Sequence, residues 1–170
     1  DWTYLFDRKT VSHNGYLMQT GVKPMTGVPE PFPLADDALP KRAWEYLDRI
    51  RELCEEKKIE LILVKAPTNS WSYWWYDEWE SQISDYAETH GLSYYNFINC
   101  QEEIGLDWST DTYDEGVHLN VSGAEKLTDY FGKLLSEQHR LPDHRTEAET
   151  AALWAEKLER YRTEQKGDQP

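Results

Sequence analysis

The sequence predicts an α/β domain with a parallel sheet, because of the order of its apolar patterns and the form of its strand-like runs. Between residues 41 and 138, segments whose apolar residues recur at spacings of three and four alternate with short, continuously apolar runs. Such alternation implies right-handed crossover connections between parallel strands. We therefore expect helix, strand, helix, strand and helix, in that order.

The first helix and the first strand are expected between residues 41 and 67. One apolar stripe marks the helix, and it comprises Ala43, Trp44, Leu47, Ile50, Leu53 and Cys54. The run IELILVKAP follows, is rich in leucine and isoleucine, and stops at Pro67. A run of this kind is typical of a strand that is buried on both faces of a parallel sheet.

The second helix, the second strand and the third helix continue the alternation. The second helix is marked by Trp75, Tyr76, Trp79, Ile83, Tyr86 and Ala87, with Gly91 as its C-terminal cap. LSYYNFI predicts the second strand, and a polar loop follows it. The third helix is marked by Val121, Ala124, Leu127, Tyr130, Phe131, Leu134 and Leu135. Asn120 and Ser122 are both suitable N-cap residues for it.

The two ends of the chain are expected to stand apart from this unit of residues 41–138. Residues 1–40 concentrate Pro and Gly, which interrupt helices and strands, so they predict an irregular lead segment. Within it, WTYLF and GYLMQTGV are candidates for short strands. Residues 139–170 predict a linker and a helix that packs on the domain or on a neighbouring chain; its apolar residues are Ala151, Trp154, Leu158 and Tyr161.

Charge and composition exclude several classes of function. A formal net charge of −14 offers no basic surface to a phosphate backbone, so no nucleic-acid partner is expected. The chain contains no run of about 18 apolar residues, which predicts no membrane-spanning segment, and no signal-peptide pattern opens it. Its histidines and cysteines lack metal-ligand spacing, so we expect neither a metal nor another cofactor.

Eight Trp and eleven Tyr make the chain rich in aromatic residues. The simpler interpretation is that these large amphipathic side chains fill the core and its interfaces. The alternative is a stacking surface for sugar rings or for a protein partner. The aromatic residues nearest the expected cleft are Trp71, Trp74, Trp75 and Trp108.

His118 is the strongest candidate for chemistry in the sequence. It lies in the loop before the third predicted helix, and open α/β sheets bind ligands in loops beyond the carboxyl ends of their strands. Asp111, Asp114 and Glu115 precede it, and a carboxylate that holds one imidazole nitrogen leaves the other free as a base. This pattern fits acyl transfer, and it equally fits a histidine that caps the helix or binds a backbone carbonyl.

The segment YDEGVHLNVSGAEKLTDYFGKLL resembles the last block of the SGNH/GDSL hydrolase superfamily. In that family an acidic residue shortly before HLN, a Gly and an amphipathic closing helix accompany the catalytic Asp and His. The upstream order of an apolar strand ending in Pro, a helix and a short strand is also similar, so the resemblance covers residues 42–137. It implies a three-layer α/β/α, flavodoxin-like fold and a Ser-His-Asp type of chemistry.

By this resemblance His118 is the general base and a neighbouring carboxylate orients it. The family's usual Asp-x-x-His spacing falls on Glu115, whereas Asp114 lies one residue further back. Both stay candidates, and Asp114 is favoured because the shorter carboxylate is the usual one in the family. The candidates for substrate contact are Trp71, Trp74, Trp108 and Asn120.

The family's nucleophile turn and its oxyanion donors have no recognisable counterpart in this sequence. Ser70 in KAPTNSW follows a strand that comes too late in the family's order, so a turn or N-cap role is favoured for it. Ser12 is discounted because adjacent residues such as His13 point to opposite sides of an extended chain. The early strands are therefore expected to lie N-terminal to Asp1. The exposed edge of an incomplete sheet would then be covered by residues 1–40 or by a partner chain.

The sequence thus predicts a segment of an SGNH-like ester hydrolase or O-acyltransferase. Its expected substrate is an acyl ester of carbohydrate, and by resemblance its expected location is extracytoplasmic, at the cell envelope. The alternative is a non-catalytic module of the same fold that binds a glycan or a protein, which the missing nucleophile favours. A homo-oligomer formed through the C-terminal helix is a further expectation.

Overall fold

The computed structural model describes residues 16–27, 36–69, 76–139 and 141–167. Within these ranges the chain is a mixed α/β structure in which two parallel strands form one sheet. Strand β1 (Ile62–Lys65) pairs with strand β2 (Ser93–Asn96), and Ile62 lies opposite Ser93. The parallel pairing and the element order confirm the α/β class that the alternation of patterns predicts.

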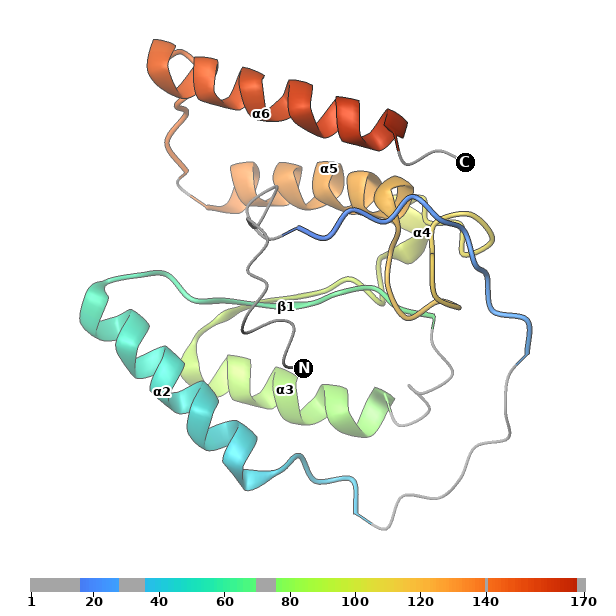
Figure 1. The fold of residues 1–170 in the computed structure, drawn as a ribbon. Helices are drawn as coiled ribbons and strands as arrows, with labels where there is room; N and C mark the ends of the chain where they lie inside the picture. Colours follow the sequence, from blue (N-terminus) through green and yellow to red (C-terminus); the bar gives the residue numbers. More distant parts are fainter. Residues whose placement is uncertain (1–15, 28–35, 70–75, 140, 168–170) are drawn as a thin grey trace, which may run out of the picture.

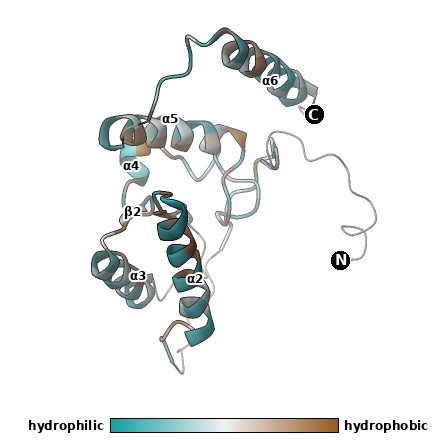
Figure 2. Cartoon of the chain, turned by 90° about the vertical axis from the view of Figure 1, so that its left-hand side faces the viewer, coloured by the Kyte–Doolittle hydropathy of each residue, from teal (hydrophilic) through white to brown (hydrophobic). Residues whose placement is uncertain are grey.

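Helices lie on both sides of the strand pair (Figure 1). Helices α2 (Lys41–Lys57) and α3 (Tyr76–His90) lie on one side, and α5 (Val121–Gln138) lies on the other. Figures 1 and 2 both show α6 (Ala148–Gly167) beyond α5, on the side away from the strands. The short helix α4 (Gln101–Ile104) occupies part of the segment for which the sequence predicts only a polar loop.

Local capping sets the helix ends where the sequence predicts them. Asn120 is the N-cap of α5, because its backbone is extended and its side-chain oxygen accepts a hydrogen bond from the amide of Gly123 at 3.2 Å. Gly91 ends α3 with a φ of +63°, a left-handed conformation that glycine adopts without steric cost. These short-range signals explain why the helices are well predicted.

The core of the described residues is small and is shared by α3, α4, the start of α5 and the residue that follows β2. Its buried apolar side chains are Ala87, Phe97, Ile104 and Val121. Phe97 is only 1% exposed, and its ring packs edge-on against Phe131 and Tyr130, with ring centroids 5.1 and 6.2 Å apart. In this region the aromatic residues have the core role that the simpler interpretation of their abundance predicts.

Two predictions about strands are wrong. Val64 in the middle of β1 is 47% exposed, so this strand is not buried on both faces, because the elements packed on the sheet leave this side chain uncovered. Residues 16–22 do not form a strand. Their backbone instead bonds to the start of α5, where the carbonyl of Gln19 accepts from the amide of Val121. The WTYLF segment lies outside the described residues.

Apolar side chains remain exposed on α2, which flanks the sheet, and on α6, which lies beyond α5. On α2, which has no buried residue, Ile50 and Leu53 are about half exposed. On α6, Trp154 and Leu158 are similarly exposed, and Figure 2 shows hydrophobic residues on both α5 and α6. Large apolar side chains thus remain in contact with solvent on both helices.

Candidate functional site

His118 lies in a loop, residues 112–120, that leads directly into α5. An antiparallel bridge between Thr112 and Leu119 closes the base of this loop. Residues just beyond the carboxyl end of β1 contact its tip, because the amide of Asn69 and the hydroxyl of Thr68 both donate to the carbonyl of Gly116, at 2.9 and 2.8 Å. The loop therefore lies at the carboxyl edge of the parallel strands, where such sheets bind ligands.

Asp114 holds His118 through two hydrogen bonds. One carboxylate oxygen lies 2.6 Å from Nδ1 of the imidazole, and the other accepts from the backbone amide of His118 at 2.7 Å. The imidazole is 64% exposed, and within the described residues no hydrogen bond involves its Nε2. One ring nitrogen is thus fixed by a carboxylate, and the other is open to a substrate or a nucleophile.

The carboxyl group of Asp114 is held in its ionised form. Partial burial raises its pKa, but hydrogen bonds from the side chain and the backbone of His118 outweigh that effect, so the pKa lies below its ordinary value. An ionised carboxylate on Nδ1 favours the tautomer in which Nδ1 carries the proton and Nε2 is free to accept one. The electrostatics therefore suit a general base.

Glu115, the other candidate, makes no hydrogen bond to His118. Its carboxylate pairs with Nζ of Lys23 at 2.9 Å, and its backbone amide donates to the carbonyl of Lys23 at 2.7 Å. Glu115 and Gly116 have φ angles of +64° and +88°, a tight left-handed turn between Asp114 and His118. Of the two candidate acids, Asp114 is therefore the carboxylate on the imidazole.

Asp111, the third acid before His118, fixes the start of the loop to α5. It is fully buried, and its carboxylate accepts hydrogen bonds from Lys126 at 2.6 Å, from Ser122 at 2.8 Å and from the amide of Asp107 at 2.8 Å. Burial raises its pKa, but these hydrogen bonds together lower it below the ordinary value. Asp111 thus ties the loop to the first turns of α5.

Asn120 has a structural role in place of the predicted substrate contact. It is 2% exposed, and its amide nitrogen donates to the carbonyls of Gly21 and Thr110 while its oxygen caps α5. Buried polar groups need hydrogen-bond partners, and these three satisfy the side chain of Asn120. No ligand is needed to explain its position.

Of the predicted tryptophans, only Trp108 lies within the described residues. Its indole nitrogen donates to Gln101 at 2.6 Å, and the amide of Gln101 donates in turn to the carbonyl of Thr68 at 3.3 Å. Trp108 therefore braces the region beside the loop that carries His118. Trp71 and Trp74 lie outside the described residues, as do the two serines considered as nucleophiles, Ser70 and Ser12.

Two other histidines also contact carboxylates, and they differ from His118 in their surroundings. The side chain of His139 is 5% exposed, and both its nitrogens have partners, Glu60 at 2.7 Å and the hydroxyl of Tyr95 at 2.8 Å. His144 pairs with Glu147 at 2.5 Å in the segment between α5 and α6. Only His118 among these three combines a fixed Nδ1, an open Nε2 and a place at the carboxyl edge of the strands.

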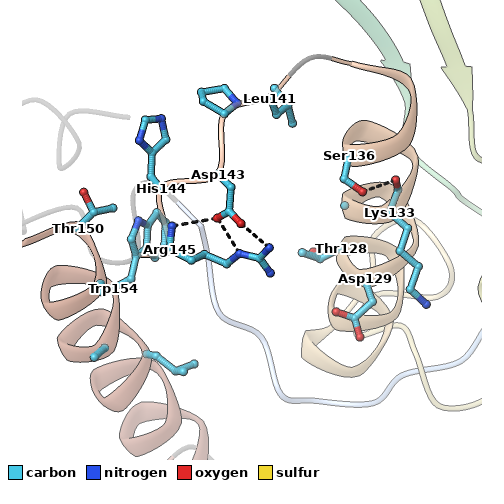
Figure 3. Close-up of a pocket in the computed structure, with 15 residues that line it drawn as sticks. Thr128, Asp129, Lys133, Ser136, Leu141, Asp143, His144, Arg145, Thr150 and Trp154 are labelled. Atoms are coloured by element: carbon cyan, nitrogen blue, oxygen red, sulfur yellow. Dashed lines mark hydrogen bonds and ion pairs between the residues drawn. The ribbon is translucent and has the colours of Figure 1, made fainter. Parts of the chain in front are cut away.

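The groove between α5 and α6 lies away from His118. It has a volume of about 910 Å³ between α5, α6 and the segment that joins them. Figure 3 shows that its most prominent charged groups face one another, because Arg145 donates to both carboxylate oxygens of Asp143 at 2.8 and 2.7 Å. No residue of the His118 loop lines it. We therefore do not place the candidate site in this groove.

Other kinds of site find little support in the described ranges. They contain no group of three or more His, Cys, Asp or Glu side chains arranged to hold a metal ion. None of their helices has both the length and the apolar character required to cross a bilayer.

Sequence reasoning missed several residues that hold the loop, namely Lys23, Thr68, Thr112 and Gln101. Each of them acts through hydrogen bonds to individual backbone or side-chain groups, which no sequence pattern marks. A single Thr or Lys in a loop is therefore not recognisable from the sequence. The left-handed pair Glu115 and Gly116 was the one readable signal, because Gly after an acidic residue favours a tight turn.

Comparison with known proteins indicates no function, so the geometry of the loop is the basis on which a function can be inferred. No protein-family model matches the chain, and the comparisons with curated proteins and with solved structures also give no match. The resemblance to the SGNH/GDSL block therefore depends on the quoted residues alone.

Proposed function

We propose that this chain is the histidine-bearing part of an SGNH-like ester hydrolase or O-acyltransferase. The pair formed by Asp114 and His118 carries this proposal, since it fixes Nδ1 at 2.6 Å and leaves Nε2 open at the carboxyl edge of the strands. A histidine held in this way accepts a proton from a hydroxyl nucleophile and later returns it.

The proposed reaction is acyl transfer in two steps. A serine hydroxyl from outside the described residues attacks the ester carbonyl, and Nε2 of His118 takes the hydroxyl proton and delivers it to the departing alkoxide. Water or an acceptor hydroxyl then attacks the acyl-serine, with His118 taking and returning the proton again. Asp114 stays ionised throughout and stabilises the imidazolium, which agrees with its lowered pKa.

The proposal includes a three-layer, flavodoxin-like sheet that continues beyond β1. Helices on both sides of the strand pair support it (Figure 1). So do the exposed side chains of Val64, Ile50 and Leu53, which a further parallel strand and its flanking layer would cover. The exposed Trp154 and Leu158 of α6 support an association between copies through that helix.

An acyl ester of carbohydrate is the proposed substrate, and the cell envelope, outside the cytoplasm, is the proposed location. Both follow from the resemblance. An aromatic ring beside the base adds support, because the ring of Tyr113 stacks on that of His118 with centroids 6.0 Å apart and planes 14° apart. Aromatic faces of this kind pack against sugar rings.

Hydrolysis of a chromogenic acetyl ester by the native full-length protein tests the proposal. His118→Ala should lower kcat/KM by about 10²–10⁴-fold, the usual contribution of a general base. His144→Ala is the matched control, because it removes an imidazole that also pairs with a carboxylate but lies in the linker. Equal rates in the wild type and His118→Ala would contradict the proposal.

One observation favours a second candidate, a non-catalytic glycan- or protein-binding module of the same fold. Within the described ranges, no serine, threonine or cysteine side chain hydrogen-bonds Nε2 of His118. For a module, the native protein would show no esterase activity and would bind an acetylated oligosaccharide as tightly in His118→Ala as in the wild type. Loss of that binding on substitution would instead place the ligand at His118.

A further inference from the structure

We propose that Thr112 is a positioning residue for His118, because its buried hydroxyl sets the turn that brings Asp114 onto the imidazole. This role rests on the proposed function of the pair. Thr112 lies six residues before His118 and does not contact the imidazole itself. It acts through the backbone of the loop and through Asp114.

The hydroxyl of Thr112 is the internal acceptor of the loop. Its oxygen accepts a hydrogen bond from the amide of Gly116 at 2.9 Å and a longer one from the amide of Asp114 at 3.4 Å. These two amides flank Glu115, the first residue of the left-handed turn. One oxygen atom thus holds both ends of the turn that determines which carboxylate faces His118.

Thr112 is itself held rigidly, so its hydroxyl is a fixed point. The residue has no exposed surface. Its carbonyl accepts a hydrogen bond from the amide of Lys23 at 2.9 Å, and its backbone forms the bridge with Leu119. The preceding residue, Asp111, is fixed by Lys126. A hydroxyl anchored in this way transmits its position to the loop without moving.

Thr112 also affects the pKa of Asp114. Burial raises the pKa of Asp114, hydrogen bonds from His118 lower it most, and the side chain of Thr112, whose oxygen accepts from the amide of Asp114 at 3.4 Å, adds to that lowering. Loss of the hydroxyl therefore has two expected effects on Asp114: its carboxylate is less well placed, and its ionised form is less favoured.

The chemical consequence lies in the tautomer of His118. While Asp114 holds Nδ1, the proton of the neutral imidazole stays on Nδ1 and Nε2 can accept another. When the turn loosens, the imidazole is free to carry its proton on Nε2, the nitrogen that must act as the base. Thr112 therefore controls the fraction of His118 that is competent for catalysis.

The test is ¹⁵N NMR of His118 in the full chain, at a pH where the imidazole is neutral, comparing Thr112→Val with Thr112→Ser. Valine keeps the shape and removes the hydroxyl, whereas serine keeps the hydroxyl. We expect Thr112→Val to lower the ratio of the Nδ1–H to the Nε2–H form by about three- to tenfold, the order set by one lost hydrogen bond. Thr112→Ser and the wild type should show mainly the Nδ1–H form.

Thr110→Val is the matched control, because Thr110 lies in the same segment but is exposed. Its hydroxyl donates to the carbonyl of Asp107 and to the carboxylate of Asp111, and not to the turn. This variant should leave the tautomer unchanged. In the ester assay Thr112→Val should lower kcat more than it changes KM, and Thr112→Ser should restore kcat. A purely structural role would not produce this selective rescue together with a tautomer change.

The outcomes separate this inference from the proposed function. An Nε2–H form in the wild type would overturn the Asp114–His118 pair as a base, and the role of Thr112 with it. An Nδ1–H form in both the wild type and Thr112→Val would overturn the role of Thr112 alone. If Thr112→Val shows no cooperative unfolding, Thr112→Cys replaces it, since a thiol is a weak acceptor; an unchanged tautomer in that variant likewise overturns the inference.

Discussion

Asp114 and Glu115 carry the same charge on adjacent residues, yet only Asp114 hydrogen-bonds His118. The backbone explains the difference, because the left-handed turn at Glu115 directs its carboxylate to Lys23. Choosing between neighbouring acids therefore depends on φ angles and on a partner 92 positions away in the chain, counted from residue 23 to residue 115. The backbone conformation of residues 114–116 thus decides which carboxylate faces the imidazole of His118.

Neutralising the two acids should have unequal effects. Asp114→Asn should lower kcat/KM for an acetyl ester by up to about 10⁴-fold, because an amide on Nδ1 no longer favours the productive tautomer. Glu115→Gln removes only an exposed ion pair with Lys23, so its kcat/KM should stay within about threefold of the wild type. Steady-state kinetics on both variants check this. A larger loss in Glu115→Gln than in Asp114→Asn would reverse the assignment.

The stability of the protein in acid should depend on Asp111 and Asp114. Asp111 and Asp114 both have folded-state pKa values below the ordinary 3.8. Their contribution to stability is therefore fully present above about pH 4 and is lost as the pH falls through the lower folded pKa values. Thermal unfolding between pH 2 and pH 6 measures this loss. Asp111→Asn should flatten the acid limb, and an unchanged limb would show that other groups cause it.

At the scale of elements, α5 is placed by a close approach of its first turn to the loop before it. A Cβ atom on Gly123 would lie 2.7 Å from the carbonyl oxygen of Asp111 and 2.9 Å from a side-chain carbon of Leu119. Gly132, further along the same helix, has no atom within 4 Å of that position. The two glycines share a helix and differ only in what surrounds them.

Alanine at these two positions should change stability in opposite directions. Gly123→Ala should destabilise the fold by about 1–3 kcal/mol, because the backbone of Asp111 must move. Gly132→Ala should stabilise it by about 0.5–1 kcal/mol, since alanine is the better helix former and no contact opposes it. Chemical denaturation gives both values. Stabilisation by Gly123→Ala would mean that α5 is not packed this closely on the loop.

At the scale of the whole molecule, burial is uneven between the two sides of the sheet. Phe97, directly after β2, is buried against α5, whereas Leu53 on α2 is 54% exposed. The largest fully buried apolar side chain of the described residues therefore lies on the side of α5. The side of α2 contributes less to the buried core, because α2 has no buried residue.

Truncating one residue on each side tests this imbalance. Phe97→Ala should cost about 3–5 kcal/mol, the usual range for a buried Phe, and Leu53→Ala should change the free energy of unfolding by no more than about 0.5 kcal/mol. Denaturant unfolding of this chain measures both. A large cost for Leu53→Ala would show that a further segment or partner covers α2 in solution.

The sequence by itself determined the order of the predicted helices and strands, their parallel pairing and the cap Gly91, and it offered Asn120 as one of two N-caps for α5. These features depend on periodicity and on short-range hydrogen bonds, which a sequence displays directly. It failed on the burial of β1, on residues 16–22 and on the role of Asn120 beyond capping. Each of those depends on which distant segments meet.

Only the tertiary structure decided that Asp114 faces His118, that Glu115 pairs with Lys23, and that Thr112 and Gly116 hold the turn between them. The physical reason is that a carboxylate interacts over a few ångströms, whereas adjacent residues on a turn can point in opposite directions. The position of each carboxylate is therefore set by the backbone angles and by partners from β1, α5 and the lead segment. Spacing along the sequence specifies neither.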